Sequence, residues 1–253
     1  MSQTIGLVIA GSLFLLWLLS LQLRNSSIVD IFWGCGFVMI AWLAFIESSG
    51  DASRRYLVVG LATLWGLRLS GYLASRNIGH GEDPRYRAMR EKHGAHWWWR
   101  SAFIVFGLQG VLMLIVSLPL QFAQISSTPL GPFDALAAAV TLAGIAFESA
   151  ADFQLARFKK NPANRGQVLK TGVWRYTRHP NYFGDFLVWW GLWGVAAAAG
   201  YAQQTLVSPL VMSFLLTRVS GVPLLEKAMK QKPGYADYVA RTSSFFPWWP
   251  REK

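Results

Sequence analysis

Residues 177–193 read TRHPNYFGDFLVWWGLW. Cationic, amide, phenolic and carboxylate side chains stand here directly before an apolar run that is rich in tryptophan. Ionisable groups are costly at membrane depth, and where they occur they mark function by default. The stretch therefore predicts a membrane helix whose first turns face a polar cofactor or substrate.

Composition places the chain among polytopic membrane proteins. Of its 253 residues, 53% are hydrophobic and only 15% are charged, whereas a soluble domain carries about 25% charged residues. The one cysteine, Cys35, excludes an internal disulfide and a cysteine-based zinc site. The first apolar stretch lacks a basic leader and a small-residue cleavage site, so we interpret it as a retained helix.

Seven stretches approach the length of about 20 apolar residues that a helix needs to cross the hydrocarbon. They are 5–21, 28–46, 56–74, 102–122, 133–155, 182–200 and 205–219. The last is short, so six crossings remain open. We expect an all-α, polytopic integral membrane protein, a bundle of seven transmembrane helices. A single domain would cover 1–253, with more variable substrate-side helices in 1–125 and a cofactor-binding region in 133–253.

Basic residues predict the orientation. All of the 24 lysines and arginines except Arg54, Arg55 and Arg68 fall in the first, third and fifth loops and the C-terminal tail. Cytoplasmic loops carry such an excess, so we expect the N-terminus outside and the C-terminus in the cytoplasm. The net charge of +11 then indicates attraction to anionic membrane lipids, and no nucleic acid is expected as a partner. Tryptophans 97–99 and 248–249, beside the basic segments, are expected to be interfacial anchors.

Acidic residues within the spans are few. Glu148 and Asp152 are four residues apart and share one helix face, which must point into the bundle or a wet cavity. Asn181 and Asp185 fall near the start of the sixth helix, where free backbone N–H groups favour a phosphate or carboxylate.

The loop 159–172 is basic, turn-prone and rich in hydrogen-bond donors, which suits anion recognition. Lipid phosphates are an equally good target for its cations. No metal-ligand spacing stands out among His80, His93, His96 and His179, so we expect no metal.

The stretch 164–185, NRGQVLKTGVWRYTRHPNYFGD, resembles the steroid 5-alpha-reductase family and the bacterial membrane proteins that share its C-terminal domain. The likeness is strong from Phe147 to Trp248 and weaker before it, where residues 65–69, WGLRL, also look like this group. The resemblance implies a seven-helix bundle that binds NADPH from the cytoplasmic side. It also implies reduction of the carbon–carbon double bond of an enone in a lipid-like substrate, typically a 3-oxo-Δ4 steroid.

The resemblance also implies roles for individual residues. Asp152 matches a cofactor contact, and Asn181 matches a residue near the nicotinamide. The full set matched to the cofactor site is Glu148, Asp152, Lys159, Asn164, Arg165, Lys170, Trp174, Tyr176, Arg178, His179, Asn181, Tyr182, Asp185, Arg218 and Tyr238. Trp65 stands where the family has a substrate-polarising tyrosine, and Asp30 is a loose match for its glutamate partner.

Two alternatives stay open. Arg178, His179, Pro180, Tyr182, Glu226, Tyr235 and Tyr238 also resemble the motif of isoprenylcysteine and phospholipid methyltransferases, which bind S-adenosylmethionine. A lipid- or sterol-binding protein without a reaction is the other alternative, and Trp65 at the tyrosine position favours it.

We expect NADPH to lie with its phosphates on the basic loop and its nicotinamide deeper in the bundle. In the family that this chain resembles, the cofactor supplies the hydride. A protonated Asp30 or Tyr72 would stabilise the enolate oxygen. The hydrophobic substrate would enter from the bilayer between the N-terminal helices. We expect a monomer, and the resemblance implies a bacterial inner membrane.

Overall fold

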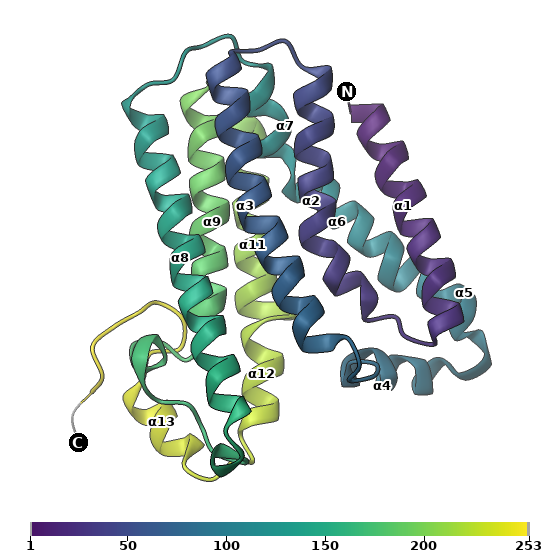
Figure 1. Cartoon of the computed structure of the whole chain (residues 1–253), viewed down its shortest axis with the longest axis vertical. Coiled ribbons are helices and arrows are strands. Elements are labelled where there is room, and N and C mark those ends of the chain that lie inside the picture. Colours follow the sequence, from purple (N-terminus) through teal and green to yellow (C-terminus); the bar gives the residue numbers. More distant parts are fainter. Residues whose placement is uncertain (1, 252–253) are drawn as a thin grey trace. The chain divides into compact units, whose positions relative to one another are not determined.

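The computed structural model describes residues 2–251, and all regular elements within this range are helical (Figure 1). Strand-like pairing among the described residues is limited to one isolated bridge, between Thr177 and Ser243. The predicted all-α class is therefore confirmed.

The chain forms two compact units. Unit 1 runs up to Gly131 and also takes Val195–Thr205, and unit 2 consists of Pro132–Gly194 and the chain from Leu206 onward. Unit 1 contains α1 (Ser2–Leu23), α2 (Ile28–Glu47), α3 (Ala52–Asn77), α4 (Pro84–His93), η1 (Gly94–His96), α5 (Trp97–Ser101), the π-helix η2 (Ala102–Gly107), α6 (Leu108–Val116), α7 (Leu118–Ile125) and α10 (Ala202–Thr205).

Unit 2 contains the long helix α8 (Pro132–Lys160) and most of α9 (Pro180–Ala198), whose last turn is counted in unit 1. Its other elements are the 3-10 turns η3 (Pro162–Asn164) and η4 (Gly172–Arg175), α11 (Val207–Phe214), the π-helix η5 (Leu215–Val219), α12 (Val222–Met229) and α13 (Tyr235–Arg241).

Six helical segments among the described residues are long and apolar enough to cross a membrane. They are Gln3–Leu23, Ile28–Glu47, Ala52–Asn77, Pro84–Ile125, Pro132–Lys160 and Ala202–Met229. A multi-pass membrane protein is therefore supported. The predicted span 182–200 also folds as a helix, α9, which carries polar Asn181 and Asp185 in its first turns and is not among the six.

In unit 1, glycines allow α2 and α3 to approach each other closely. A Cβ atom added to Gly66 would lie 2.6 Å from the side chain of Val38 and 3.2 Å from the carbonyl carbon of Gly34. One turn further along α3, the Ser70 hydroxyl accepts a hydrogen bond from the backbone N–H of Cys35 (2.9 Å). Small residues of this kind let membrane helices pack backbone against backbone.

At the other end of α3, the guanidinium of Arg54 is completely buried. It donates to the carbonyl oxygens of Thr128 (3.2 Å), Pro129 (3.2 Å) and Val195 (3.0 Å). Its neighbour Arg55 donates to the Phe45 carbonyl and lies over the Phe45 ring. Both cations are thus used inside unit 1.

In unit 2, α8 and α9 run antiparallel and in direct contact. A Cβ on Gly144 would lie 2.6 Å from the carbonyl oxygen of Gly184, and a Cβ on Gly191 would lie 2.7 Å from the backbone nitrogen of Thr141. Residues later in α8 contact residues earlier in α9, so the two helices run in opposite directions. Figure 1 shows them as neighbouring ribbons.

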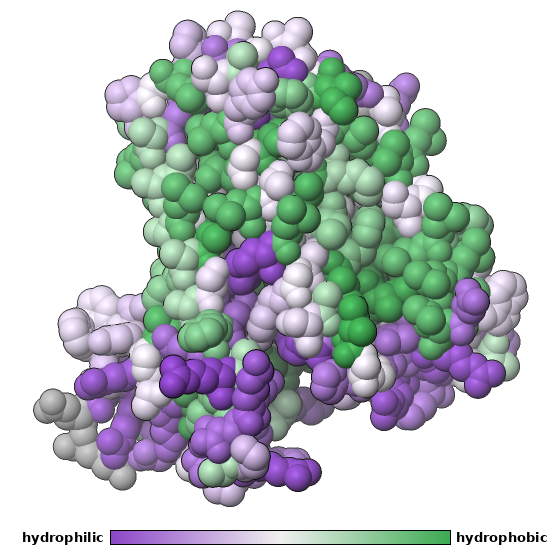
Figure 2. All heavy atoms as spheres, in the orientation of Figure 1, coloured by the Kyte–Doolittle hydropathy of each residue, from purple (hydrophilic) through white to green (hydrophobic). Residues whose placement is uncertain are grey.

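Figure 2 shows apolar side chains over the helices of each unit, while hydrophilic side chains gather at α4 in unit 1 and around the α8–α9 loop and α13 in unit 2. Trp98, Trp99, Trp248 and Trp249 are exposed, as interfacial anchors would be. Trp97 does not fit that expectation. It is buried beneath the guanidinium of Arg90 and the ring of His93, because the turn at Gly94 directs this side chain into unit 1.

The glycine contact of unit 2 gives a stability prediction. Gly144→Ala places a methyl group against the Gly184 carbonyl, and overpacking of this kind costs about 1–3 kcal/mol. The thermal unfolding midpoint of the purified protein in detergent should therefore fall. Gly60→Ala is the control, because no atom lies within 4 Å of that added methyl group. Equal midpoints for the two variants would contradict the packing described here.

Candidate functional site

Four of the polar residues singled out in the sequence lie at the contact between α8 and α9. Glu148 and Asp152 are both buried on α8. A Cβ on Gly184 would lie 2.6 Å from the backbone nitrogen of Glu148, so Glu148 is level with the turn that joins Asn181 to Asp185. In an antiparallel pair, Asp152 is then level with the very start of α9. The structure therefore brings the two predicted polar faces together.

Asn181 leaves hydrogen-bonding capacity unused at this contact. Its Oδ1 atom is buried and has no hydrogen-bond partner among the described residues. A buried amide oxygen without a partner is costly, and such groups call for an explanation such as a ligand or an ordered water. Asn181 is thus a predicted site residue at which the structure gives a direct sign of a ligand.

The returning part of the α8–α9 loop is fixed to α8 through Trp174. The Trp174 indole N–H donates to the Ala151 carbonyl (3.1 Å), and the Trp174 carbonyl accepts from the Tyr238 hydroxyl (2.5 Å). Burial raises the pKa of Tyr238, so this phenol remains a donor. Gln154 adds a bond, because its Oε1 accepts from the Val173 N–H (3.0 Å). Trp174 and Tyr238 therefore position the loop.

Two loop cations line one pocket. A cavity of about 330 Å³ is lined by Arg165, Gly166, Gln167, Val168, Lys170 and Pro233. A Cβ on Gly234 would lie 3.2 Å from Nζ of Lys170, which places this ammonium beside the tight turn before α13. Gly166 and Gly234 both have positive φ (82° and 73°), a conformation that glycine adopts without strain. Two cations that line one pocket suit a phosphate group.

Arg178, His179 and Glu226 form a clamp, in which His179 is buried and the other two side chains are partly exposed. Arg178 Nε donates to Glu226 Oε1 (2.8 Å), and His179 Nε2 lies 3.1 Å from the same oxygen. Arg178 also donates to the carbonyls of Thr242 (2.8 Å) and Val239 (3.2 Å), which ties α12 and α13 to the start of α9. Three of the seven residues that resemble the methyltransferase motif are thus joined through the Glu226 carboxylate.

The tautomer of His179 follows from this geometry. A carboxylate can only accept, so His179 Nε2 carries the proton and Nδ1 is an acceptor. Nδ1 is buried and has no partner among the described residues. Burial lowers the pKa of His179 below its ordinary value of 6.5, although the Glu226 carboxylate acts in the opposite direction. The Tyr182 ring stacks on the imidazole at 5.8 Å.

The remaining predicted cofactor residues lie around this site or at its surface. Tyr176 packs edge-on against Trp249, and Asn164 donates to the Phe158 carbonyl (2.9 Å). Lys159 is exposed at the end of α8, and Arg218 is exposed on the π-helix η5. Among residues 2–251, no group of three or more His, Cys, Asp and Glu side chains is arranged to hold a metal ion.

The three residues predicted to be catalytic make separate contacts in unit 1. Asp30 accepts from the Tyr86 hydroxyl (2.6 Å) and pairs with Arg85 (2.9 Å). Trp65 is fully buried against Phe37, and the ring of Tyr72 lies near the Arg76 guanidinium. Asp30 is therefore an acceptor in this structure, and its assigned role as a donor stays a prediction.

Sequence reasoning missed the polar cluster around Asp30. Arg85 also contacts Asp83 (2.9 Å), and Arg90 forms a two-bond pair with Glu82 (2.8 and 2.9 Å). Hydrogen bonds outweigh the effect of burial and lower the pKa values of Glu82 and Asp83. The sequence did contain a signal for the start of α4. Asp83 is its N-cap residue and Pro84 its first helical residue, a pair that marks a helix start.

The buried imidazole gives a pH prediction. Because its pKa is lower in the folded than in the unfolded chain, the unfolded chain binds more protons, and stability is lost as the pH falls below about 6.5. The midpoint of thermal unfolding should fall between about pH 7.5 and pH 5.5. His179→Gln should flatten this fall, whereas His96→Gln, at an exposed position, should leave it unchanged. An identical slope in the wild type and His179→Gln would rule the assignment out.

Comparison with known proteins gives one family and one relative. The family model described as "Protein of unknown function (DUF1295)" matches residues 16–242. A protein of Schizosaccharomyces pombe named "Uncharacterized protein C594.04c" is 25% identical over 262 residues, which cover 92% of this chain and 75% of the relative. No solved structure matches. Because the family model covers most of both units, including all of the polar contacts described above, the chain belongs to the DUF1295 family.

Proposed function

We propose that the protein is a membrane reductase that uses NADPH to reduce a carbon–carbon double bond conjugated to a ketone. Its substrate would be a steroid or another lipid-like enone. The sequence basis is the resemblance of 164–185 to the steroid 5-alpha-reductase family. The observation that carries the proposal is the pocket lined by Arg165 and Lys170, on the same loop that leads to the buried Asn181 amide.

The chain's own residues fit the cofactor. Arg165 and Lys170 would hold a phosphate group, and Asn181 would offer its amide to the nicotinamide. Asp152 and Tyr176 would contact the ribose and neighbouring groups. When bound, NADPH supplies the hydride, and the protein supplies orientation and electrostatics. S-adenosylmethionine has no phosphate, so the two-cation pocket favours the phosphorylated dinucleotide.

The protein must also stabilise the developing enolate oxygen, which requires a hydrogen-bond donor. We keep Asp30, Trp65 and Tyr72 as the proposed catalytic residues. The pair of Tyr86 and Asp30 adds a phenolic hydroxyl to this set. We further propose seven membrane crossings, with α9 as the sixth. The other parts of the proposal are an external N-terminus, a monomeric state and a bacterial inner membrane.

Cofactor binding to the detergent-purified protein tests the proposal. We expect NADPH to raise the thermal unfolding midpoint, NADH to raise it less, and S-adenosylmethionine to leave it unchanged. Asn181→Ala should weaken NADPH binding and abolish NADPH-dependent enone reduction. Stabilisation by S-adenosylmethionine alone would overturn the reductase and favour a methyltransferase, with Arg178, His179 and Glu226 around its cofactor.

The phosphate assignment has its own prediction. Lys170→Gln and Arg165→Gln should each weaken NADPH binding by about 10- to 100-fold, since a charge-assisted contact to phosphate is lost, while NADH binding changes little. Lys227→Gln removes an exposed cation outside the pocket and serves as the matched control. The measurement is a titration by calorimetry. Equal losses for NADPH and NADH would place the 2′-phosphate elsewhere.

A further inference from the structure

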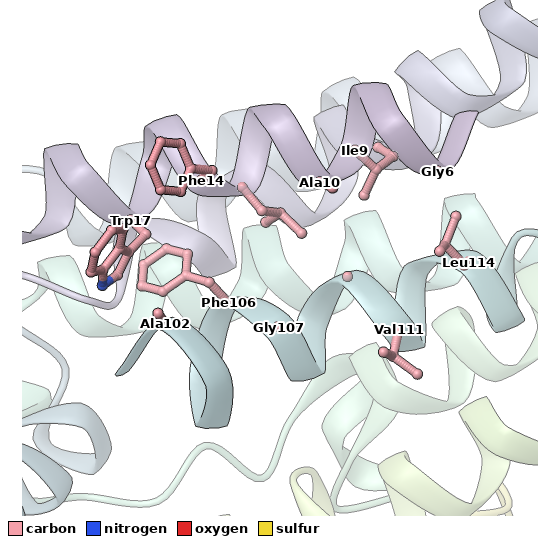
Figure 3. Close-up of a pocket in the computed structure, with 12 residues that line it drawn as sticks. Gly6, Ile9, Ala10, Phe14, Trp17, Ala102, Phe106, Gly107, Val111 and Leu114 are labelled. Carbon is pink, nitrogen blue, oxygen red and sulfur yellow. The ribbon is translucent and has the colours of Figure 1, made fainter. Parts of the chain in front are cut away.

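Unit 1 contains an apolar groove that is lined by none of the residues assigned to the proposed reaction. The groove runs along α1 and is closed on its other side by the π-helix η2 and α6 (Figure 3). Its volume is about 290 Å³. The lining is almost entirely apolar and consists of Gly6, Ile9, Ala10, Leu13, Phe14, Trp17, Ala102, Phe106, Gly107, Gly110, Val111 and Leu114.

The shape of the groove follows from small residues and from the π-helix. A Cβ on Gly6 would have no atom within 4 Å, so this glycine leaves the groove open. Ala102, Phe106 and Gly107 line it from η2. A π-helical turn carries an extra residue and bulges from the helix, and such bulges are frequent at functional sites. The bulge therefore helps to form the wall that faces α1.

The length of the groove matches one leaflet of a bilayer. From Gly6 to Trp17 the lining advances 11 residues along α1, which corresponds to about 16 Å. Half of a hydrocarbon core is about 15 Å thick. A cavity of about 290 Å³ spread over this length is long and narrow, which suits one extended hydrocarbon chain better than the fused rings of a sterol.

The Trp17 end of the groove lies at a basic, aromatic segment. The Trp17 indole N–H donates to the Trp98 carbonyl (3.0 Å) and to the Ser101 hydroxyl (3.2 Å). Arg100 lies between these two partners in the chain, and its guanidinium carbon is 5.4 Å from the Trp99 ring. Exposed tryptophans mark the headgroup level, and arginine or lysine there attracts anionic lipid.

We propose that this groove binds one acyl chain of an anionic membrane phospholipid, with the lipid phosphate at Arg100. The apolar lining would contact the acyl chain. Arg100, whose guanidinium also lies 2.9 Å from Nδ1 of His93, would bind the headgroup together with the exposed Lys92. Segment 84–100 carries several basic residues and one acidic residue, Glu91, so its charge complements an anionic headgroup. This lipid site is independent of the proposed reductase activity.

Native mass spectrometry of the full-length protein tests the site. The purified protein is titrated with phosphatidylglycerol and with phosphatidylcholine that carries the same acyl chains. We expect phosphatidylglycerol to bind about 5-fold more tightly, because one cation at a membrane surface contributes about 1 kcal/mol. Equal binding of the two lipids would mean ordinary boundary lipid and would overturn the proposal.

Variants separate the chain from the headgroup. Gly6→Leu fills the groove and should weaken binding of both lipids at least 5-fold. Gly11→Leu is the matched control, because it adds the same side chain to open space on the same helix outside the groove. Arg100→Gln should weaken phosphatidylglycerol binding more than phosphatidylcholine binding, because the choline ammonium already offsets the phosphate charge in phosphatidylcholine. The preference for phosphatidylglycerol should therefore be lost.

If Gly6→Leu is not monodisperse, Ala10→Leu replaces it, since Ala10 also lines the groove. If a folded variant with a filled groove binds lipid as tightly as the wild type does, the groove is not the binding site. NADPH binding, followed in parallel, should be the same in Gly6→Leu and Gly11→Leu, which keeps failure of the lipid site distinct from failure of the reductase proposal.

Discussion

Close backbone contact between antiparallel helices is the constraint on which both units depend. In unit 1 it lies at Gly34 and Gly66, and in unit 2 it lies at Gly144, Gly184 and Gly191. Lipid tails are as apolar as leucine, so membrane helices gain little from burying apolar surface against each other. Tight packing and hydrogen bonds must hold them together instead. Glycine at these positions lets the backbones approach to a distance that no larger residue permits.

In unit 2 this contact also determines where polar chemistry is located. Gly184 packs on the backbone of Glu148, so the residues that flank the glycine, Asn181 and Asp185, are held next to the acidic face of α8. The loop between the two helices is fixed at Trp174, and the C-terminal segment is fixed by the clamp of Arg178 and Glu226. One helix pair thus supports the amide, the cationic loop and the segment that packs against that loop.

The sequence predicted where the long apolar helices lie, because stretches of apolar residues near the length of a bilayer core have few other structures open to them. It also predicted the shared face of Glu148 and Asp152, because that face follows from helical periodicity alone. The pairing of Asp30 with Tyr86 and Arg85 was missed, because those partners lie 56 and 55 residues away in a loop that was interpreted only by its charge. The π-helices leave no clear sequence signal, and the burial of Trp97 depends on the turn at Gly94.

Arg54 has a consequence for how the chain inserts into a membrane. The translocation machinery meets each hairpin before tertiary contacts exist, so the charges of Arg54 and Arg55 then oppose the bias set by the more numerous cations of the other loops. After folding, both guanidinium groups are bonded to backbone carbonyls within unit 1. Two charges that disfavour the proposed orientation during synthesis thereby become internal cross-links in the mature protein. Mutating them would separate the two stages, since loss of either charge should favour correct insertion while weakening the folded state.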